Sequence, residues 1–197
     1  MREKEQVINE IIQNEWVMFS SVNKAAGQSF KPSEHPSCQD FPDEFRLHRE
    51  SKLLPWSRQT LNSYLKDLVR ARDLGKNLMT YKYARMDNLI PCENKSPRIE
   101  AIADQLVKWQ KGFMEKYPGI MSGARPLSGG RPGVDWASFE NYLRCELETY
   151  SEKTLEYLFL DIMTMKQQGK SMSEEVYAHL VGKKGYVSLD QAEDKMN

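Results

Sequence analysis

Residues 96–119 read SPRIEAIADQLVKWQKGFMEKYPG, and this segment decides the fold class. Ser96 is a capping residue and Pro97 suits the first helical position, so the pair is a strong helix start. The residues that follow recur at steps of three and four, as on one face of a helix, and the Tyr-Pro-Gly run at 117–119 ends the pattern. That face consists of Ile99, Ile102, Ala103, Leu106, Gln110 and Phe113.

Similar helical patterns recur along the rest of the chain, whereas β-branched residues are few and never alternate over a useful length. We therefore predict an all-α fold of about seven helices with no sheet. It would form a single globular domain over residues 1–197, with loops at about 23–41 and 118–134. Besides the segment above, the expected helices are 3–22, about 42–52, one between Ser57 and Gly75, and one from Asn77 through Met86. A long helix would follow from a cap at Asp135 toward Gln168, broken or recapped near Ser151. One more would run from a cap at Ser173 to Gly182, with a short one after Ser188.

The composition of the chain argues against nucleic-acid binding and against a membrane protein. Lys plus Arg and Asp plus Glu number 28 each among 197 residues, so no global field attracts nucleic acid, and no basic recognition helix stands out. No run approaches the roughly 20 apolar residues that span a bilayer, and no apolar stretch typical of a signal peptide follows the charged N-terminus. The three cysteines are scattered, which suits a reducing compartment. We expect a cytoplasmic protein that binds neither nucleic acid nor membrane.

Two carboxylates lie on apolar helical faces. Glu15 follows Ile11 by four residues and precedes Phe19 by four, and Glu146 stands at helical spacing from Tyr142 and Tyr150. A buried carboxylate needs a cation, a metal or hydrogen-bond donors, because burying it unpaired is costly. Each is therefore either half of a structural ion pair with an arginine or a catalytic carboxylate of a site.

The richest stretch in reactive groups is Ser37–Trp56. Cys38 is a candidate nucleophile, with Asp40 as a candidate catalytic base. Gln39, His48 and Arg49 are candidate substrate-binding residues. The alternatives are that Cys38 is a small buried hydrophobe and that Asp40 caps a helix.

Four arginines could clamp a carboxylate or phosphate in bidentate fashion: Arg49, Arg85, Arg125 and Arg144. One or two of them could instead be structural partners of Glu15 and Glu146. Arg125 lies in the Gly- and Pro-rich segment 118–134, which lacks the spacing, the preceding strand and the Lys-Ser or Lys-Thr of a phosphate loop. That segment is either a surface loop or an anion-binding lid.

Metal sites have little support in the sequence. Bundled di-metal sites use Glu-x-x-His pairs, and the chain has none. Its i, i+4 pairs, Glu44 with His48 and Glu175 with His179, read as surface pairs. We predict no metal site, although a lone ion held by Glu15, Glu146 and His48 remains open. The sequence identifies no cofactor.

Several local strings resemble an uncharacterised bacterial family catalogued as domain of unknown function 4125. They are Glu15-Trp16-x-Met18-Phe19, Cys38-Gln39-Asp40, Gly75-x-Asn77-Leu78, Lys82-Tyr83-Ala84-Arg85-Met86, Ala124-Arg125-Pro126, Tyr142-Leu143-Arg144 and Thr149-Tyr150-Ser151-Glu152-Lys153-Thr154-Leu155-Glu156. They extend over nearly the whole chain, so the resemblance implies one full domain, but it implies no reaction. The segment 23–36 is longer than the short joint expected before Cys38.

Two hypotheses follow. In the first, the protein is a small-molecule enzyme with a carboxylate or thiol as reactive group and arginines that bind an anionic substrate. In the second, it is a non-catalytic helical module that binds a partner protein or a small ligand. The sequence decides neither between them nor the oligomeric state.

Overall fold

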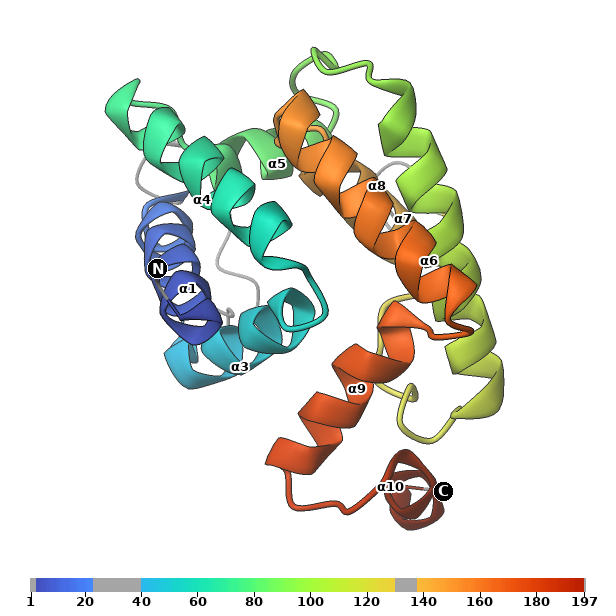
Figure 1. Ribbon diagram of the computed structural model, residues 1–197. Helices are drawn as coiled ribbons and strands as arrows, with labels where there is room; N and C mark the ends of the chain where they lie inside the picture. The colour runs from blue at the N-terminus through green and yellow to red at the C-terminus, as the bar shows by residue number, and fades with distance from the viewer. Residues whose placement is uncertain (1–2, 23–39, 130–137, 197) are drawn as a thin grey trace.

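The computed structural model describes residues 3–22, 40–129 and 138–196, and these residues form nine helices and no strand (Figure 1). The all-α prediction is therefore confirmed, with nine helices in the described residues where about seven were expected. The helices are α1 (Lys4–Ser20), α3 (Pro42–Leu53), α4 (Arg58–Asp73), α5 (Leu78–Met86), α6 (Pro97–Lys116), α7 (Phe139–Leu147), α8 (Glu152–Gln167), α9 (Met172–Lys183) and α10 (Leu189–Met196). Among the described residues, no helix has the length and apolar composition needed to cross a membrane.

Local chemistry sets most helix ends where the sequence predicts them. Ser96 caps α6 by accepting a hydrogen bond from the Arg98 amide, and Pro97 occupies the first turn. Ser57 and Asn77 cap α4 and α5 in the same way. Gly75 follows α4 with φ of +66°, a left-handed conformation that costs glycine least.

The predicted long C-terminal helix is divided into α7 and α8, and the division lies near Ser151, where the sequence predicts a break or a second cap. Ser151 caps α8, and its amide donates to Asp67 Oδ2 at 3.0 Å. Tyr150 lies between the two helices, and its hydroxyl donates to Glu146 Oε1 at 2.8 Å. The cap of α7 is Ser138, whereas the predicted cap, Asp135, lies outside the described residues.

The predicted start of α9 is wrong. The residue that caps this helix is Ser171, and not Ser173. Ser173 lies within the first turn, where its hydroxyl is buried and donates to Gln110 Oε1 of α6 at 3.0 Å. The local pattern predicts that Ser173 caps the helix, but its hydroxyl instead makes a tertiary hydrogen bond to α6.

The helices pack in a closed order that surrounds the interior. Contacts run from α1 to α4, from α4 to α8, from α8 to α6, and back through α7 and α5 to α1. In Figure 1, α1 and α4 lie on one side and α6 and α8 on the other. Helix α3 packs on α1 and on α9, and α9 packs on α6. Inward positions on α1, α3, α5 and α7 can therefore meet at one place.

Candidate functional site

Arg49 of α3 is the hub of a buried ion-pair network. Its Nε donates to Glu15 Oε2 at 2.7 Å, and its Nη2 donates to Glu15 Oε1. Its Nη1 and Nη2 each lie 3.1 Å from Glu146 Oε1. Arg49 is 5% exposed, Glu15 0% and Glu146 2%. The Arg49 guanidinium thus contacts both carboxylates that the sequence places on apolar helical faces. Each of the two glutamates forms an ion pair with this arginine.

Glu146 of α7 has an uneven hydrogen-bond environment. Its Oε1 accepts from Arg49, from Lys52 Nζ at 2.6 Å and from the Tyr150 hydroxyl at 2.8 Å. Its buried Oε2 accepts no hydrogen bond from any described residue, and Lys82 Nζ lies 3.8 Å away. An unsatisfied buried oxygen is costly, and the positive charge of Lys82 beside Oε2 offsets part of that cost.

Positive charge exceeds negative charge in this network. We define the buried charge cluster as Arg49, Lys52, Lys82, Glu15 and Glu146, which are three cations and two carboxylates. Lys82 is 2% exposed, so its charge is taken out of water with the others. Net charge in a buried environment is unfavourable unless a counterion compensates it.

The cluster shifts the proton affinities of its members. Burial disfavours the ionised form of Glu146, but Arg49, Lys52 and Lys82 outweigh burial and hold its pKa well below the ordinary value. Burial lowers the pKa of Lys52 to about 8, although Glu146 favours its charged form. At neutral pH the glutamate is therefore a carboxylate that holds cations, and it is not available as a general acid.

Three cations also surround the ring of Tyr142 on α7. Lys82 Nζ lies 4.2 Å from the ring centroid and donates to the hydroxyl at 2.7 Å. Arg125 Cζ lies 5.2 Å from the centroid and Lys52 Nζ lies 6.0 Å from it. We call Lys52, Lys82 and Arg125 around Tyr142 the basic centre. Burial raises the pKa of Tyr142, so its phenol stays neutral.

Backbone hydrogen bonds fix the segment that carries Arg125. The amide of Phe139 donates to the Pro126 carbonyl at 2.8 Å, and the amide of Glu140 donates to the Leu127 carbonyl at 3.0 Å. These bonds tie the residues after Arg125 to the first turn of α7, the helix of Tyr142. The arginine is exposed, so solvent reaches this side of the basic centre.

Arg85 and Arg144, also predicted to bind an anion, lie outside the buried charge cluster and the basic centre. Arg85 pairs with Glu148, at 2.6 Å between Nε and Oε2, and donates to the Ile90 carbonyl. It does not pair with Glu15 or Glu146. Arg144 faces outward, where its acidic partners are Glu140, Glu100 and Asp104. Of the four arginines, Arg49 joins the buried charge cluster and Arg125 the basic centre.

The Cys38 segment is only partly described. Asp40 is exposed at the start of the described range, and Cys38 and Gln39 lie outside it. His48 is exposed on α3, where partial desolvation of the imidazole lowers its pKa although the nearby Glu44 favours the charged form. The structure does not bring His48 to Glu15 and Glu146, and no group of His, Cys, Asp and Glu within the described ranges could hold a metal ion.

One predicted histidine pair is wrong. His179 does not pair with Glu175, whose partner is Lys170 at 3.8 Å. Its Nδ1 lies 2.8 Å from Ser51 Oγ, and its Nε2 lies 3.6 Å from Glu50 on α3. Because α9 packs against α3, His179 contacts residues of α3 and not the glutamate of its own helix.

Sequence reasoning missed five members of the site: Lys52, Lys82, Tyr64, Tyr142 and Tyr150. Tyr64 donates to Glu15 Oε1 at 2.7 Å. A signal existed for Lys82, because it lies three residues after Met79 and four before Met86, both of them buried. A polar residue at helical spacing from apolar residues on both sides is predicted to face the core. This rule identified Glu15, and it applies equally to a lysine.

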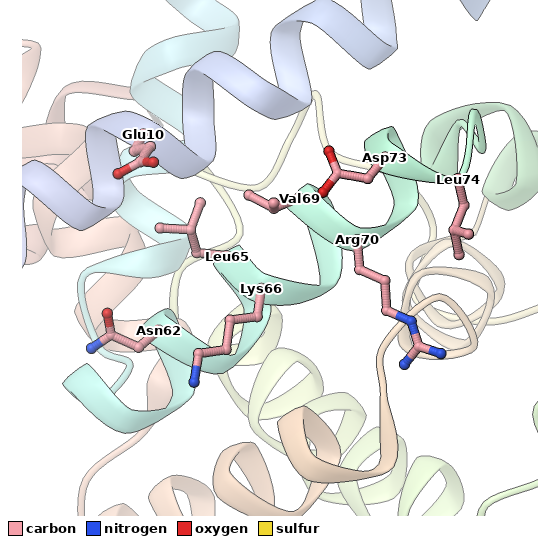
Figure 2. Close-up of a pocket in the computed structure, with 8 residues that line it drawn as sticks. All are labelled: Glu10, Asn62, Leu65, Lys66, Val69, Arg70, Asp73 and Leu74. Carbon is pink, nitrogen blue, oxygen red and sulfur yellow. The ribbon is translucent and has the colours of Figure 1, made fainter.

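Two surface grooves lie away from the cluster. One of about 570 Å³ runs along α4, with Glu10 of α1 at its edge (Figure 2). The other, of about 440 Å³, lies among α1, α3 and α9 and includes His179. Neither is lined by a residue of the buried charge cluster or of the basic centre. We place the candidate site at the basic centre because its three cations gather around one ring beside the buried charge cluster. The α4 groove is lined largely by solvated side chains.

Comparison with known proteins gives one result. The family model described as "Protein of unknown function (DUF4125)" matches residues 5–194. No curated protein and no solved structure matches the chain. The strings that resemble the family supply Glu15, Lys82, Arg125 and Tyr142, which the fold brings to the cluster and the basic centre. A match over nearly the whole length shows that the chain belongs to the DUF4125 family of proteins of unknown function.

Proposed function

We propose that the protein binds a small anionic ligand at the basic centre. The observation that carries the proposal is the concentration of Lys52, Lys82 and Arg125 around one tyrosine ring, at 6.0, 4.2 and 5.2 Å from its centroid. In the buried charge cluster next to it, cations outnumber carboxylates by three to two among the described residues. A carboxylate or phosphate group would supply the missing negative charge and accept hydrogen bonds from the cations.

The same contacts favour binding over acid–base catalysis by the glutamates. Glu15 accepts hydrogen bonds from Nε and Nη2 of Arg49 and from Tyr64. Glu146 Oε1 accepts from Arg49, Lys52 and Tyr150. Proton transfer by either group would break ion pairs in a buried environment. Their role in this proposal is to fix the cations that hold the anion. If the protein is an enzyme, a cation of the centre, and not a glutamate, would polarise the substrate.

Isothermal titration calorimetry with inorganic phosphate tests the proposal at constant ionic strength. We expect saturable binding to the unaltered protein and a loss of affinity of about tenfold or more in Arg125→Gln, because a hydrogen bond between charged groups contributes about 1.5–3 kcal/mol. Arg125 is exposed, so the variant should fold.

Arg58→Gln is the matched control, since Arg58 is also exposed and lies on α4. It should bind phosphate like the unaltered protein. Absence of phosphate binding, or an equal loss in the two variants, would contradict an anion site at the basic centre.

A further inference from the structure

We infer that the ligand is an aromatic acid, whose acid group binds the basic centre and whose ring lies against neighbouring aromatic side chains. The inference rests on the proposed function and names the class of its ligand. It comes from a second feature beside the cations, which we call the aromatic strip: Trp16 and Phe19 of α1, Phe45 of α3 and Tyr83 of α5.

The rings of the aromatic strip form one continuous series. Trp16 and Phe45 have centroids 5.2 Å apart, and Phe45 stacks on Phe19 at 5.2 Å with an interplanar angle of 10°. Phe19 and Tyr83 lie 6.2 Å apart. These spacings are those of favourable aromatic pairs.

Helical spacing places the strip directly beside the charges. Phe19 is four residues after Glu15 on α1, and Phe45 is four residues before Arg49 on α3, so each pair shares a face. On α5, Lys82 Nζ lies 5.1 Å from the Tyr83 ring centroid and 4.2 Å from that of Tyr142. The Lys82 ammonium is therefore the point at which the aromatic strip meets the basic centre.

The strip differs from the aromatic core of the protein in its exposure. Trp56, Tyr64 and Tyr150 also contact one another, but each is only 2% exposed. In the strip, Trp16, Phe45 and Tyr83 all keep part of their surface exposed, and only Phe19 is buried. Phe41, at the start of α3, is 47% exposed.

A partly exposed aromatic surface that adjoins concentrated positive charge matches a ligand with a ring at one end and an acid at the other. An acid without a ring would engage the cations but gain nothing from the exposed parts of these rings. A neutral aromatic compound would cover the rings and leave the excess charge uncompensated. Binding sites commonly combine an apolar lining with a few placed polar groups in this way.

Calorimetry with benzoate, cyclohexanecarboxylate and acetate tests the inference, at constant pH and ionic strength. The three carry the same charge and differ in their apolar part. We expect benzoate to bind about tenfold or more tightly than acetate, and several-fold more tightly than cyclohexanecarboxylate, because ring contacts add to area burial. Phe45→Leu should remove most of the preference for benzoate and leave acetate affinity unchanged.

Phe159→Leu is the control, because Phe159 is a partly buried phenylalanine of α8 outside the strip. It should bind all three acids like the unaltered protein. If acetate and benzoate bind equally and both depend on Arg125, the aromatic class is wrong and the anion site stands. If benzoate and cyclohexanecarboxylate bind equally, the preference for aromatic rings is wrong. If none of the acids and no phosphate binds, the proposed function falls as well.

Discussion

Replacing Arg49 by methionine is expected to lower the free energy of unfolding by about 3–5 kcal/mol, the range for breaking a buried ion pair by removal of one partner. Methionine fills similar space but donates no hydrogen bond, so Glu15 loses both of its contacts with the guanidinium. Glu146 loses one of its two cations from α3 and keeps Lys52. Urea unfolding followed by circular dichroism at pH 7 measures the change.

Arg144→Met is the matched control for this prediction. Arg144 also has several acidic partners, but Glu100 and Asp104 are largely exposed, with side-chain exposures of 65% and 74%. Surface ion pairs contribute about 0–1 kcal/mol, so this variant should lose no more than about 1 kcal/mol. Equal losses in the two arginine variants would contradict the central structural role of Arg49.

Glu146→Gln is expected to have the next largest effect, a loss of about 3 kcal/mol at pH 7. The amide keeps the shape of the side chain but removes the charge that Lys52 and Arg49 contact. Three cations would then face the single carboxylate of Glu15. The urea midpoint at pH 7, with the slope of the transition compared between proteins, gives this loss.

The pH dependence of that loss has a definite sign. The cations hold the pKa of Glu146 in the folded protein below its ordinary value of 4.5, so its stabilisation is complete above that pH and is lost as the pH falls through the folded value. The difference in free energy of unfolding between the unaltered protein and Glu146→Gln should therefore shrink as the pH falls from 6 to below about 4.5. Glu115→Gln, at an exposed site, should show no such dependence. A difference that persists undiminished to pH 3 would contradict the lowered pKa.

Local rules predicted much of the fold and part of the cluster. Caps such as Ser57, Asn77 and Ser96 depend on a few neighbouring residues, and the structure confirms them. The burial of Glu15 followed from helical periodicity alone, because its place on an apolar face leaves it no route to water.

The rest depends on contacts between elements far apart in the sequence. The partner of Glu15 is 34 residues away and that of Arg85 is 63 residues away, and no spacing rule connects them. The sequence predicts a break or cap near Ser151, but it does not predict that Asp67 of α4 accepts the hydrogen bond of the Ser151 amide. Lys82 was overlooked because lysines are nearly always exposed, although its position between buried methionines marked it as inward-facing.

The central claim is that the excess positive charge of the cluster binds an anion, and the dependence of stability on phosphate tests it most directly. Lys82→Met balances the cluster at two cations and two carboxylates. Lys153→Met is the control, because Lys153 lies 4.5 Å from the Tyr157 ring on the surface. The measurement is the free energy of unfolding in urea as a function of phosphate concentration, at constant ionic strength.

For the unaltered protein and Lys153→Met, the account predicts a rise of about 1.4 kcal/mol for each tenfold increase in phosphate above the dissociation constant. For Lys82→Met it predicts no rise. Parallel curves for all three proteins would contradict the account.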